Sequence, residues 1–256
     1  MTLSAKAARL LELHEAPELL TLVNVWDPVS AKVVAGVEGT AALATASHSI
    51  AASFGYEDGE RIPLDLHLEA IGRIVASTDL PVSADLEAGY GDVGETIRRA
   101  IGVGVVGANI EDQLRPLDDA VRNVEAALAA GEAEGIRFVL NARTDAMIRG
   151  DAPLERKLDE AIRRGRAYLA AGAPCVFVPG LLDEDQVTRL VEELGERRVS
   201  VIHVPGSVPL RRLEELGVAR VSFGPWPQRV ALTALEELVL GVREGRGLPE
   251  GTRVLN

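Results

Sequence analysis

Four acidic residues lie close to the ends of predicted strands, where they could take part in chemistry. Asp58 follows the second predicted strand, Asp85 and Glu87 close the third, and Glu111 closes the fourth. Carboxylates that gather at one end of a parallel barrel repel one another and resist ionisation, unless a cation or a proton relieves them. A divalent metal ion explains the pattern most simply. For any one of these acids alone, a solvated loop residue is the alternative.

The segment 85–91 carries the strongest part of this pattern. Asp85 and Glu87 are two residues apart, and strand alternation predicts that both side chains point to the same face. The glycines at 89 and 91 allow a tight turn after them. Such oxygen ligands suit Mg²⁺, with Mn²⁺ as an alternative, and Mg²⁺ takes only one or two carboxylates directly. We expect one acid to bind the ion directly and the others to bind through water.

Two further residues could hold an anionic substrate. Arg143 closes the fifth predicted strand, and its planar guanidinium matches a carboxylate or phosphonate; neutralising the nearby acids is the alternative role. Ser47 precedes a short helical run, so it could hold a carboxylate at the helix N-terminus or act as an ordinary N-cap. Asp145 could hold Arg143 or cap the next helix. Asp112 is expected to pair with an arginine or to cap, and not to act in catalysis.

The histidines and the cysteine give weaker signals. His48 is interpreted as a hydrogen-bonded spacer in preference to a general base, and His203 as a core histidine inside an apolar strand. His14 and His67 fall on predicted helices as surface or packing residues. The single cysteine, Cys175, lies in an apolar run and is predicted to be a buried packing thiol.

The elements that must position these residues follow a regular alternation. Short apolar runs rich in β-branched residues are separated by amphipathic helical segments, many of which end at glycine. Eight runs are found, at residues 22–26, 41–45, 82–86, 106–110, 138–142, 175–178, 199–204 and 220–223. Apolar strands with helical crossovers imply a parallel sheet that is buried on both faces. We predict an α/β fold, a (β/α)₈ TIM-type barrel, with an open doubly wound sheet as its competitor.

Composition limits the size of the fold and the class of partner. The 256 residues, 47% of them hydrophobic, suit one barrel domain over 1–256, with a C-terminal helix and tail at 231–256 that could serve oligomerisation. The net charge of −12 argues against nucleic acid and anionic membranes as partners. The charged start at 1–20 and the lack of a long apolar run predict a cytoplasmic protein. A small carboxylate is the expected partner.

In order and spacing these motifs resemble the isocitrate lyase and phosphoenolpyruvate mutase superfamily. The similar segments are 26–31, 47–59, 85–91, 109–112 and 141–145. The resemblance implies a (β/α)₈ barrel, often with a terminal helix exchanged within a homodimer or homotetramer, and Mg²⁺-dependent chemistry on C–C or P–C bonds beside a 2-oxo acid. The residue roles that it implies are Asp85 as the direct metal ligand, Glu87, Glu111 and Asp58 in the surrounding shell, and Ser47 and Arg143 as carboxylate holders.

Two departures from the superfamily pattern bear on the reaction. Isocitrate and methylisocitrate lyases carry a catalytic cysteine in the loop after the fourth-strand acid, and residues 113–119 have none. Phosphonate-acting members tend to carry a histidine at the end of strand six, where this chain has Pro179. Arg115, in the altered loop, either restores positive charge over the pocket or is solvated.

Three functional hypotheses follow. The leading one is a Mg²⁺-dependent lyase that cleaves a C–C bond of a small 2-oxo or 2-hydroxy carboxylate through an enolate, with Asp58 and Arg143 in catalytic roles. The second is a phosphoenolpyruvate mutase-like or phosphonopyruvate hydrolase-like enzyme acting on a P–C bond. The third is a catalytically silent barrel that binds a carboxylate.

Overall fold

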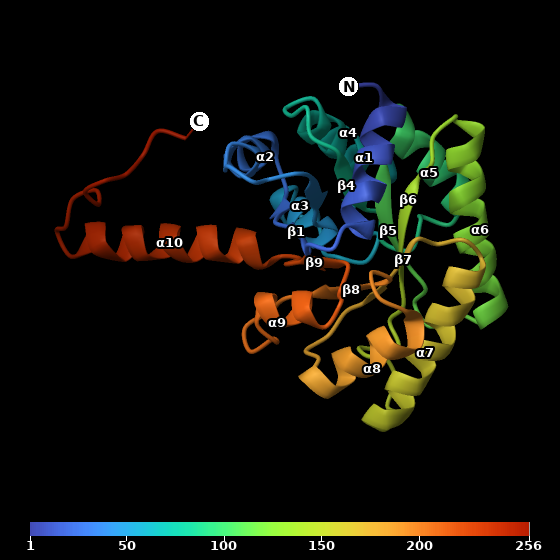
Figure 1. Cartoon of the computed structure of the whole chain (residues 1–256). Coiled ribbons are helices and arrows are strands. Elements are labelled where there is room, and N and C mark those ends of the chain that lie inside the picture. The colour runs from blue at the N-terminus through green and yellow to red at the C-terminus, as the bar shows by residue number, and fades with distance from the viewer. Residues whose placement is uncertain (256) are drawn as a thin grey trace.

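The computed structural model describes residues 1–255 and contains a single parallel sheet that curves into a barrel (Figure 1). Its strands are β1 (Leu20–Leu22), β2 (Asn24–Val25), β3 (Leu43–Thr45), β4 (Val82–Asp85), β5 (Gly107–Glu111), β6 (Val139–Arg143), β7 (Cys175–Val178), β8 (Val199–Ile202) and β9 (Arg220–Ser222). Their order is β1-β9-β8-β7-β6-β5-β4-β3-β2. Since β1 and β2 are one chain segment interrupted at Val23, this segment joins β9 to β3 and closes the barrel. The predicted barrel is confirmed.

Helices alternate with the strands and surround them (Figure 1). They are α1 (Leu3–Glu15), α2 (Pro28–Ala35), α3 (Ser47–Ser53), α4 (Leu64–Val75), α5 (Val93–Gly102), α6 (Leu117–Ala133), α7 (Leu154–Ala170), α8 (Glu184–Leu194), α9 (Leu210–Glu215) and α10 (Trp226–Arg243). The amphipathic stretches 118–130, 154–171, 185–194 and 209–216 of the sequence predict α6 to α9 to within a few residues.

Two helices that the apolar periodicity did not reveal begin at clear capping residues. Asp27 accepts the Ser30 backbone N–H at 2.6 Å, and the Ser30 hydroxyl group in return accepts the Asp27 N–H at 3.1 Å. This reciprocal pair, with Pro28 at the first helical position, starts α2. Asp92 accepts the Glu95 N–H at 3.0 Å and starts α5 in the same way. Capping chemistry therefore marks both helices in the sequence.

The amino-terminal end of the barrel is closed by α1. Leu10 packs so tightly on Gly107, at the start of β5, that a Cβ at that position would lie 2.7 Å from the leucine Cδ2 atom. His14, one turn further along α1, is fully buried beside Arg220, the first residue of β9. The Arg220 guanidinium donates to the Ser83 hydroxyl at 3.0 Å, and burial lowers its pKa to about 10. The contacts of Leu10, His14 and Arg220 at this end of the barrel are therefore structural.

Replacing His14 with leucine should make the protein more resistant to acid. Burial, together with the charge on Arg220, lowers the pKa of His14 from 6.5 to about 3. As the pH falls below about 6.5, the unfolded chain binds a proton here that the folded chain refuses, so the wild type loses stability. Between pH 7 and pH 4 the free energy of unfolding of the wild type should fall by about 3 kcal/mol relative to the variant. Urea titrations across this range measure the difference, and parallel pH profiles would contradict it.

The C-terminal helix α10 extends away from the barrel (Figure 1). It begins at Trp226, five residues before the predicted start at 231. Several of its large apolar side chains are about half exposed or more, namely Val230, Leu232, Leu235, Val239, Leu240 and Val242. In the described part of the chain, no helix combines the length and the apolar character needed to cross a membrane.

Candidate active site

A cavity of about 320 Å³ lies at the carboxyl ends of the strands. This is the face where barrels of this kind hold their active sites. Four of the predicted residues line it: Ser47, Asp58, Asp85 and Arg143. The predicted Glu87 and Glu111 are not part of this lining. Glu111 contacts the lining residue Arg143, and Glu87 is close enough to Asp85 and Asp58 for their charges to raise its pKa.

Asp85 is the most precisely held acid of the site. Its backbone N–H donates to Thr45 Oγ1 at 3.0 Å, and its Oδ2 accepts the Ser47 hydroxyl at 2.8 Å and the Ser47 N–H at 3.3 Å. The same hydroxyl lies 3.4 Å from Asp58. Asp85 Oδ1 is buried and has no hydrogen-bond partner. One oxygen of the carboxylate is thus anchored, and the other remains available to a ligand.

The N-cap interpretation of Ser47 is wrong. The N-cap of α3 is Ala46, and Ser47 is the first residue of the helix. Its hydroxyl proton is directed to Asp85. In this structure Ser47 therefore orients an acid, and does not present a free hydroxyl donor to a substrate carboxylate.

Glu87 reaches the site by a different route from the one predicted. Strand β4 ends at Asp85, and Glu87 has a left-handed φ of 53°, so strand alternation does not orient its side chain. Its carboxylate accepts the Glu60 N–H and the Tyr90 hydroxyl, the latter at 3.1 Å. Burial raises the pKa of Glu87 to about 7, and the charges of Asp85 and Asp58 add to the rise. The negative charges of Glu87, Asp85 and Asp58 therefore repel one another.

Glu111 and Arg143 form a buried ion pair. The sheet register sets them side by side, and Arg143 Nη1 lies 2.9 Å from Glu111 Oε2. Asp145 accepts from Arg143 Nε at 2.8 Å, as one of its predicted roles required, and also binds Arg149 at 2.7 Å. Burial raises the pKa of Glu111 to about 7, although Arg143 acts in the opposite direction. In this structure the Glu111 carboxylate is therefore already paired with Arg143.

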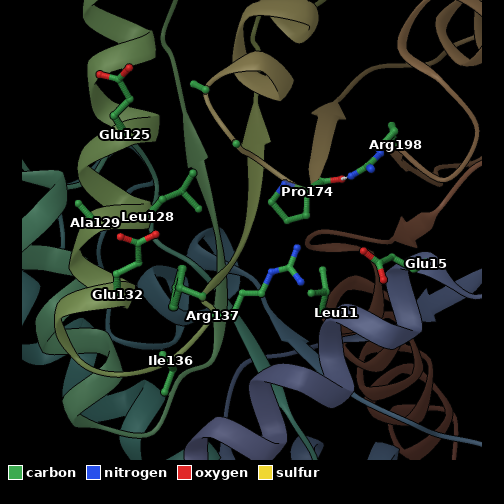
Figure 2. A pocket seen from close by; sticks show the side chains of 13 residues that line it. Leu11, Glu15, Glu125, Leu128, Ala129, Glu132, Ile136, Arg137, Pro174 and Arg198 are labelled. Carbon is green, nitrogen blue, oxygen red and sulfur yellow. Dashed lines mark hydrogen bonds between the residues drawn. The ribbon is translucent and has the colours of Figure 1, made fainter.

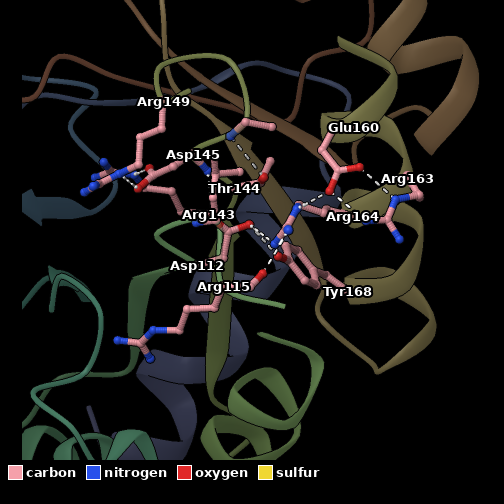
Figure 3. Close-up of polar contacts among 12 residues, drawn as sticks. Asp112, Arg115, Arg143, Thr144, Asp145, Arg149, Glu160, Arg163, Arg164 and Tyr168 are labelled. Carbon is pink, nitrogen blue, oxygen red and sulfur yellow. Dashed lines mark hydrogen bonds and ion pairs between the residues drawn. The ribbon is translucent and has the colours of Figure 1, made fainter. Parts of the chain in front are cut away.

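Asp112 sits at the centre of a buried network (Figure 3). One of its oxygens accepts the backbone N–H groups of Leu114 at 2.9 Å and Asp145 at 3.0 Å. The other accepts Arg164 at 3.1 Å and the Tyr168 hydroxyl at 2.6 Å. The expectation that Asp112 pairs with an arginine is confirmed. Through Asp145, this network also fixes the segment that holds Arg143.

Donor chemistry and burial decide whether the site suits a metal ion. In the range 1–255, no three His, Cys, Asp or Glu side chains converge closely enough to form a metal-holding group. The unpartnered buried oxygen of Asp85 and the raised pKa values of Glu87 and Glu111 do fit a hard cation nearby. The unpartnered oxygen of Asp85 therefore fits a hard cation.

The structure also places residues that the sequence reading missed or misjudged. Asn24, Asn109 and Phe177 line the cavity, and a polar residue inside an apolar strand was the available signal for the two asparagines. His48 lines it too, and its buried Nδ1 has no partner, so the spacer interpretation is wrong for that atom. His203 follows β8 and is half-buried, not a core residue. Cys175 is fully buried, as predicted.

A larger cavity of about 420 Å³ lies at the opposite end of the barrel (Figure 2). Phe138, Pro174 and Arg198, which line it, directly precede β6, β7 and β8, so it faces the amino ends of the strands. Its charged residues, such as Glu132 and Arg137, are exposed. We assign no chemistry to this groove, because the active face of such barrels is the other end.

Comparison with known proteins agrees with this fold and site. The sequence profile of a family described as phosphoenolpyruvate phosphomutase matches residues 10–243. An uncharacterised protein of Mycobacterium tuberculosis is 32% identical over 202 residues, covering 76% of this chain and 74% of that protein. The 2,3-dimethylmalate lyase of Eubacterium barkeri is 26% identical over 212 residues, covering 80% of this chain and 73% of the lyase. A Burkholderia cenocepacia protein of known crystal structure superposes with a TM-score of 0.86 at 43% identity, covering 91% of this chain and 98% of that one.

The barrel, with acids and an arginine at its carboxyl end, is of the kind found in the isocitrate lyase and phosphoenolpyruvate mutase superfamily of enzymes. The chain belongs to the phosphoenolpyruvate phosphomutase family. The resemblance inferred from the sequence motifs is thereby confirmed.

Proposed function

We propose that this protein is a Mg²⁺-dependent lyase that cleaves a C–C bond of a small 2-oxo or 2-hydroxy carboxylate through an enolate. The observation that carries the proposal is the buried, unpartnered oxygen of Asp85 in a cavity that Arg143 also lines. Mg²⁺ is the leading cofactor, with Mn²⁺ as an alternative. Lyases among the relatives, such as 2,3-dimethylmalate lyase, support this class of reaction.

The residues divide the work between binding and orientation. Asp85 would hold the ion directly, with Glu87, Glu111 and Asp58 around it. Bound Mg²⁺ would supply positive charge that stabilises an enolate as it develops. Arg143 would bind the substrate carboxylate, because its guanidinium is already fixed by Glu111 and Asp145. Ser47 orients Asp85, and a direct contact from Ser47 to the substrate carboxylate would require its hydroxyl to turn away from Asp85.

Proton transfer falls to the remaining titratable groups of the lining, Asp58 and His48. The loop after Glu111 supplies no cysteine, and the position after β7 is Pro179, which is buried in the cavity wall. We propose Asp58 as the acid–base group, in keeping with its predicted catalytic role. His48 is the candidate to test beside it, since its Nδ1 lacks a partner.

A substrate panel tests the proposed reaction class. Oxaloacetate, 2-methylisocitrate, other 2-hydroxy acids and phosphonopyruvate would be followed by NMR with Mg²⁺ and with a chelator. We expect C–C cleavage of at least one carboxylate, abolished by the chelator. Turnover of phosphonopyruvate alone would instead favour P–C chemistry, and binding without any turnover would favour a silent barrel.

The Arg143→Lys variant should bind carboxylates more weakly. A lysine replaces a fixed planar fork with a mobile point charge and cannot satisfy Glu111, Asp145 and a ligand together. We expect roughly a tenfold rise in the dissociation constant for oxalate in Mg²⁺, which corresponds to about 1.4 kcal/mol. Calorimetry measures this, and Arg189→Lys, in an exposed ion pair on α8, is the matched control. An unaltered constant would show that Arg143 only neutralises the acids.

We also propose that α10 mediates a homodimer or homotetramer. The helix extends away from the barrel (Figure 1). It exposes a row of apolar side chains that a solvated monomer would not favour. Glutamates at Leu235 and Val239 should therefore reduce the molar mass measured by light scattering to that of a monomer. A wild-type protein that is already monomeric would contradict this assembly.

A further inference from the structure

The cavity has two chemically different halves. The polar half comes from β2 to β5 and the segments that follow them, and includes Asn24, Ser47, His48, Asp58, Asp85 and Asn109. The apolar half comes from the ends of β7 and β8 and the loops after β6, β7 and β8, and includes Ile148, Phe177, Pro179, Leu181, Ile202 and Val204. Ser222, Gly224 and Pro225, at the end of β9 and after it, complete the lining. Because the strands follow one another around the barrel in chain order, the two halves face each other across the mouth.

Arg143 stands where the two halves meet. It ends β6, and its guanidinium carbon lies 5.9 Å from the centre of the Phe177 ring. On its other side it is bound by Glu111 and Asp145. Arg143 is the only lysine or arginine among the residues that line this cavity. The lining itself therefore offers a ligand one permanently charged cation, at the boundary between the halves, in addition to the Mg²⁺ ion proposed for Asp85.

The distribution of charge disfavours a second carboxylate on the ligand. The 2-oxo acid end of a ligand, with its carboxylate, can lie at Arg143 and at the Mg²⁺ ion proposed for Asp85, but a carboxylate further along the ligand would face Asp58 on the polar side or alkyl groups on the apolar side. An anion placed on the apolar side would lose water without gaining a partner. The wall opposite the acids thus suits an uncharged part of the substrate.

The rim of the apolar half leaves aliphatic surface open to solvent. Ile148 is 47% exposed and Leu181 is 63% exposed, although both line the cavity. They come from two different loops, after β6 and after β7. An alkyl group placed between them and Phe177 would remove apolar surface from water on both molecules.

We propose that the substrate is a 2-oxo acid with a single carboxylate, a hydroxyl group on its fourth carbon and, beyond that carbon, a short uncharged alkyl group that lies against the apolar half of the cavity. When Asp58 takes the hydroxyl proton, the bond between the third and fourth carbons breaks: its electron pair stays with the 2-oxo acid part as an enolate, and the fourth carbon leaves as an aldehyde that carries the alkyl group. This deepens the proposed function and rests on it, since the carboxylate end is placed by Arg143 and Asp85. The cavity of about 320 Å³ limits the alkyl group to a few carbons.

Calorimetry with matched 2-oxo acids tests the proposal. In MgCl₂, the wild-type protein would be titrated with pyruvate, 2-oxobutanoate, 2-oxopentanoate and 2-oxoglutarate. Each added methylene should tighten binding by about fourfold. 2-Oxopentanoate should bind at least tenfold more tightly than 2-oxoglutarate, which has the same number of carbons and a second carboxylate. A flat series, or tighter binding of 2-oxoglutarate, would overturn the proposal.

A lysine in the apolar half should reverse this preference. Leu181 is exposed enough for Leu181→Lys to fold. In this variant the affinity for 2-oxoglutarate should rise at least tenfold relative to the affinity for 2-oxopentanoate. Leu154→Lys is the control, since Leu154 is 53% exposed and lies outside the cavity lining. An unchanged ratio in Leu181→Lys would overturn the proposed position of the alkyl group.

The two levels of proposal fail in different ways. If pyruvate itself shows no Mg²⁺-dependent binding, the proposed function is wrong and the alkyl preference falls with it. If pyruvate binds with Mg²⁺ but the longer acids bind no more tightly than pyruvate, only the alkyl preference is wrong.

Discussion

Replacing Asp85 with alanine should abolish Mg²⁺-dependent binding of oxalate while the barrel stays folded. The substitution removes the one acid in the cavity whose second oxygen is buried and free of protein donors. Without it, the remaining acids offer no direct ligand at the same place, so we expect affinity to fall at least a hundredfold. Titration calorimetry of oxalate with and without Mg²⁺ is the measurement.

A pair of variants separates ligand loss from damage to the fold. Asp85→Asn keeps an oxygen for the Ser47 hydroxyl but removes the charge, so it should lose Mg²⁺-dependent binding with little change in thermal stability. Asp151→Ala, an exposed loop acid, should behave as the wild type. Unchanged oxalate affinity in both Asp85 variants would remove this residue from the site.

The second large effect is expected at Asp112, where Asp112→Asn should lower the free energy of unfolding by about 3 to 5 kcal/mol. Asp112 and Arg164 are 2% and 6% exposed, so neutralising the acid leaves a buried guanidinium without its carboxylate partner at that end. The Tyr168 hydroxyl loses a charged acceptor as well. Denaturant unfolding measures the loss.

Asp112 also accepts the Asp145 backbone N–H, so changing Asp112 should alter the geometry of the cavity. We expect Asp112→Asn to weaken oxalate binding through a displaced Arg143, even at temperatures where the variant is fully folded. Asp65→Asn, which breaks an exposed pair with Arg99, is the matched control and should cost under about 1 kcal/mol. If the free energy of unfolding fell equally in the two variants, the Asp112 network would contribute no more to stability than a surface ion pair.

The strands were predictable because each buried strand can be recognised from its own run of consecutive apolar residues. β7 spans Cys175–Val178, the predicted range, since four consecutive buried positions leave only apolar residues in the sequence. The first strand was predicted as one run, whereas the structure interrupts it at Val23 to pair β9 on one side and β3 on the other. That interruption depends on closing the barrel, which involves residues about 200 positions away.

The candidate site was predictable in its residue types and only partly in its contacts. Glu111 and Arg143 lie on separate strands, and their ion pair follows from a sheet register that the sequence does not state. Ser47 and Asp85 are 38 positions apart, so the hydrogen bond between them could not be inferred from spacing. Glu87 shows the limit of strand alternation, because a left-handed residue breaks the period just after β4.

The division of the cavity has a consequence for engineering. The acids and amides of one wall derive from chain positions 24–109, while the opposite wall derives from 148–204. Randomising only the lining residues of the second stretch would leave the anchoring groups of the first stretch untouched, and would also keep Arg164 and Tyr168, which bind Asp112. Libraries confined to the loops after β6, β7 and β8 should therefore yield altered selectivity more often than inactive protein.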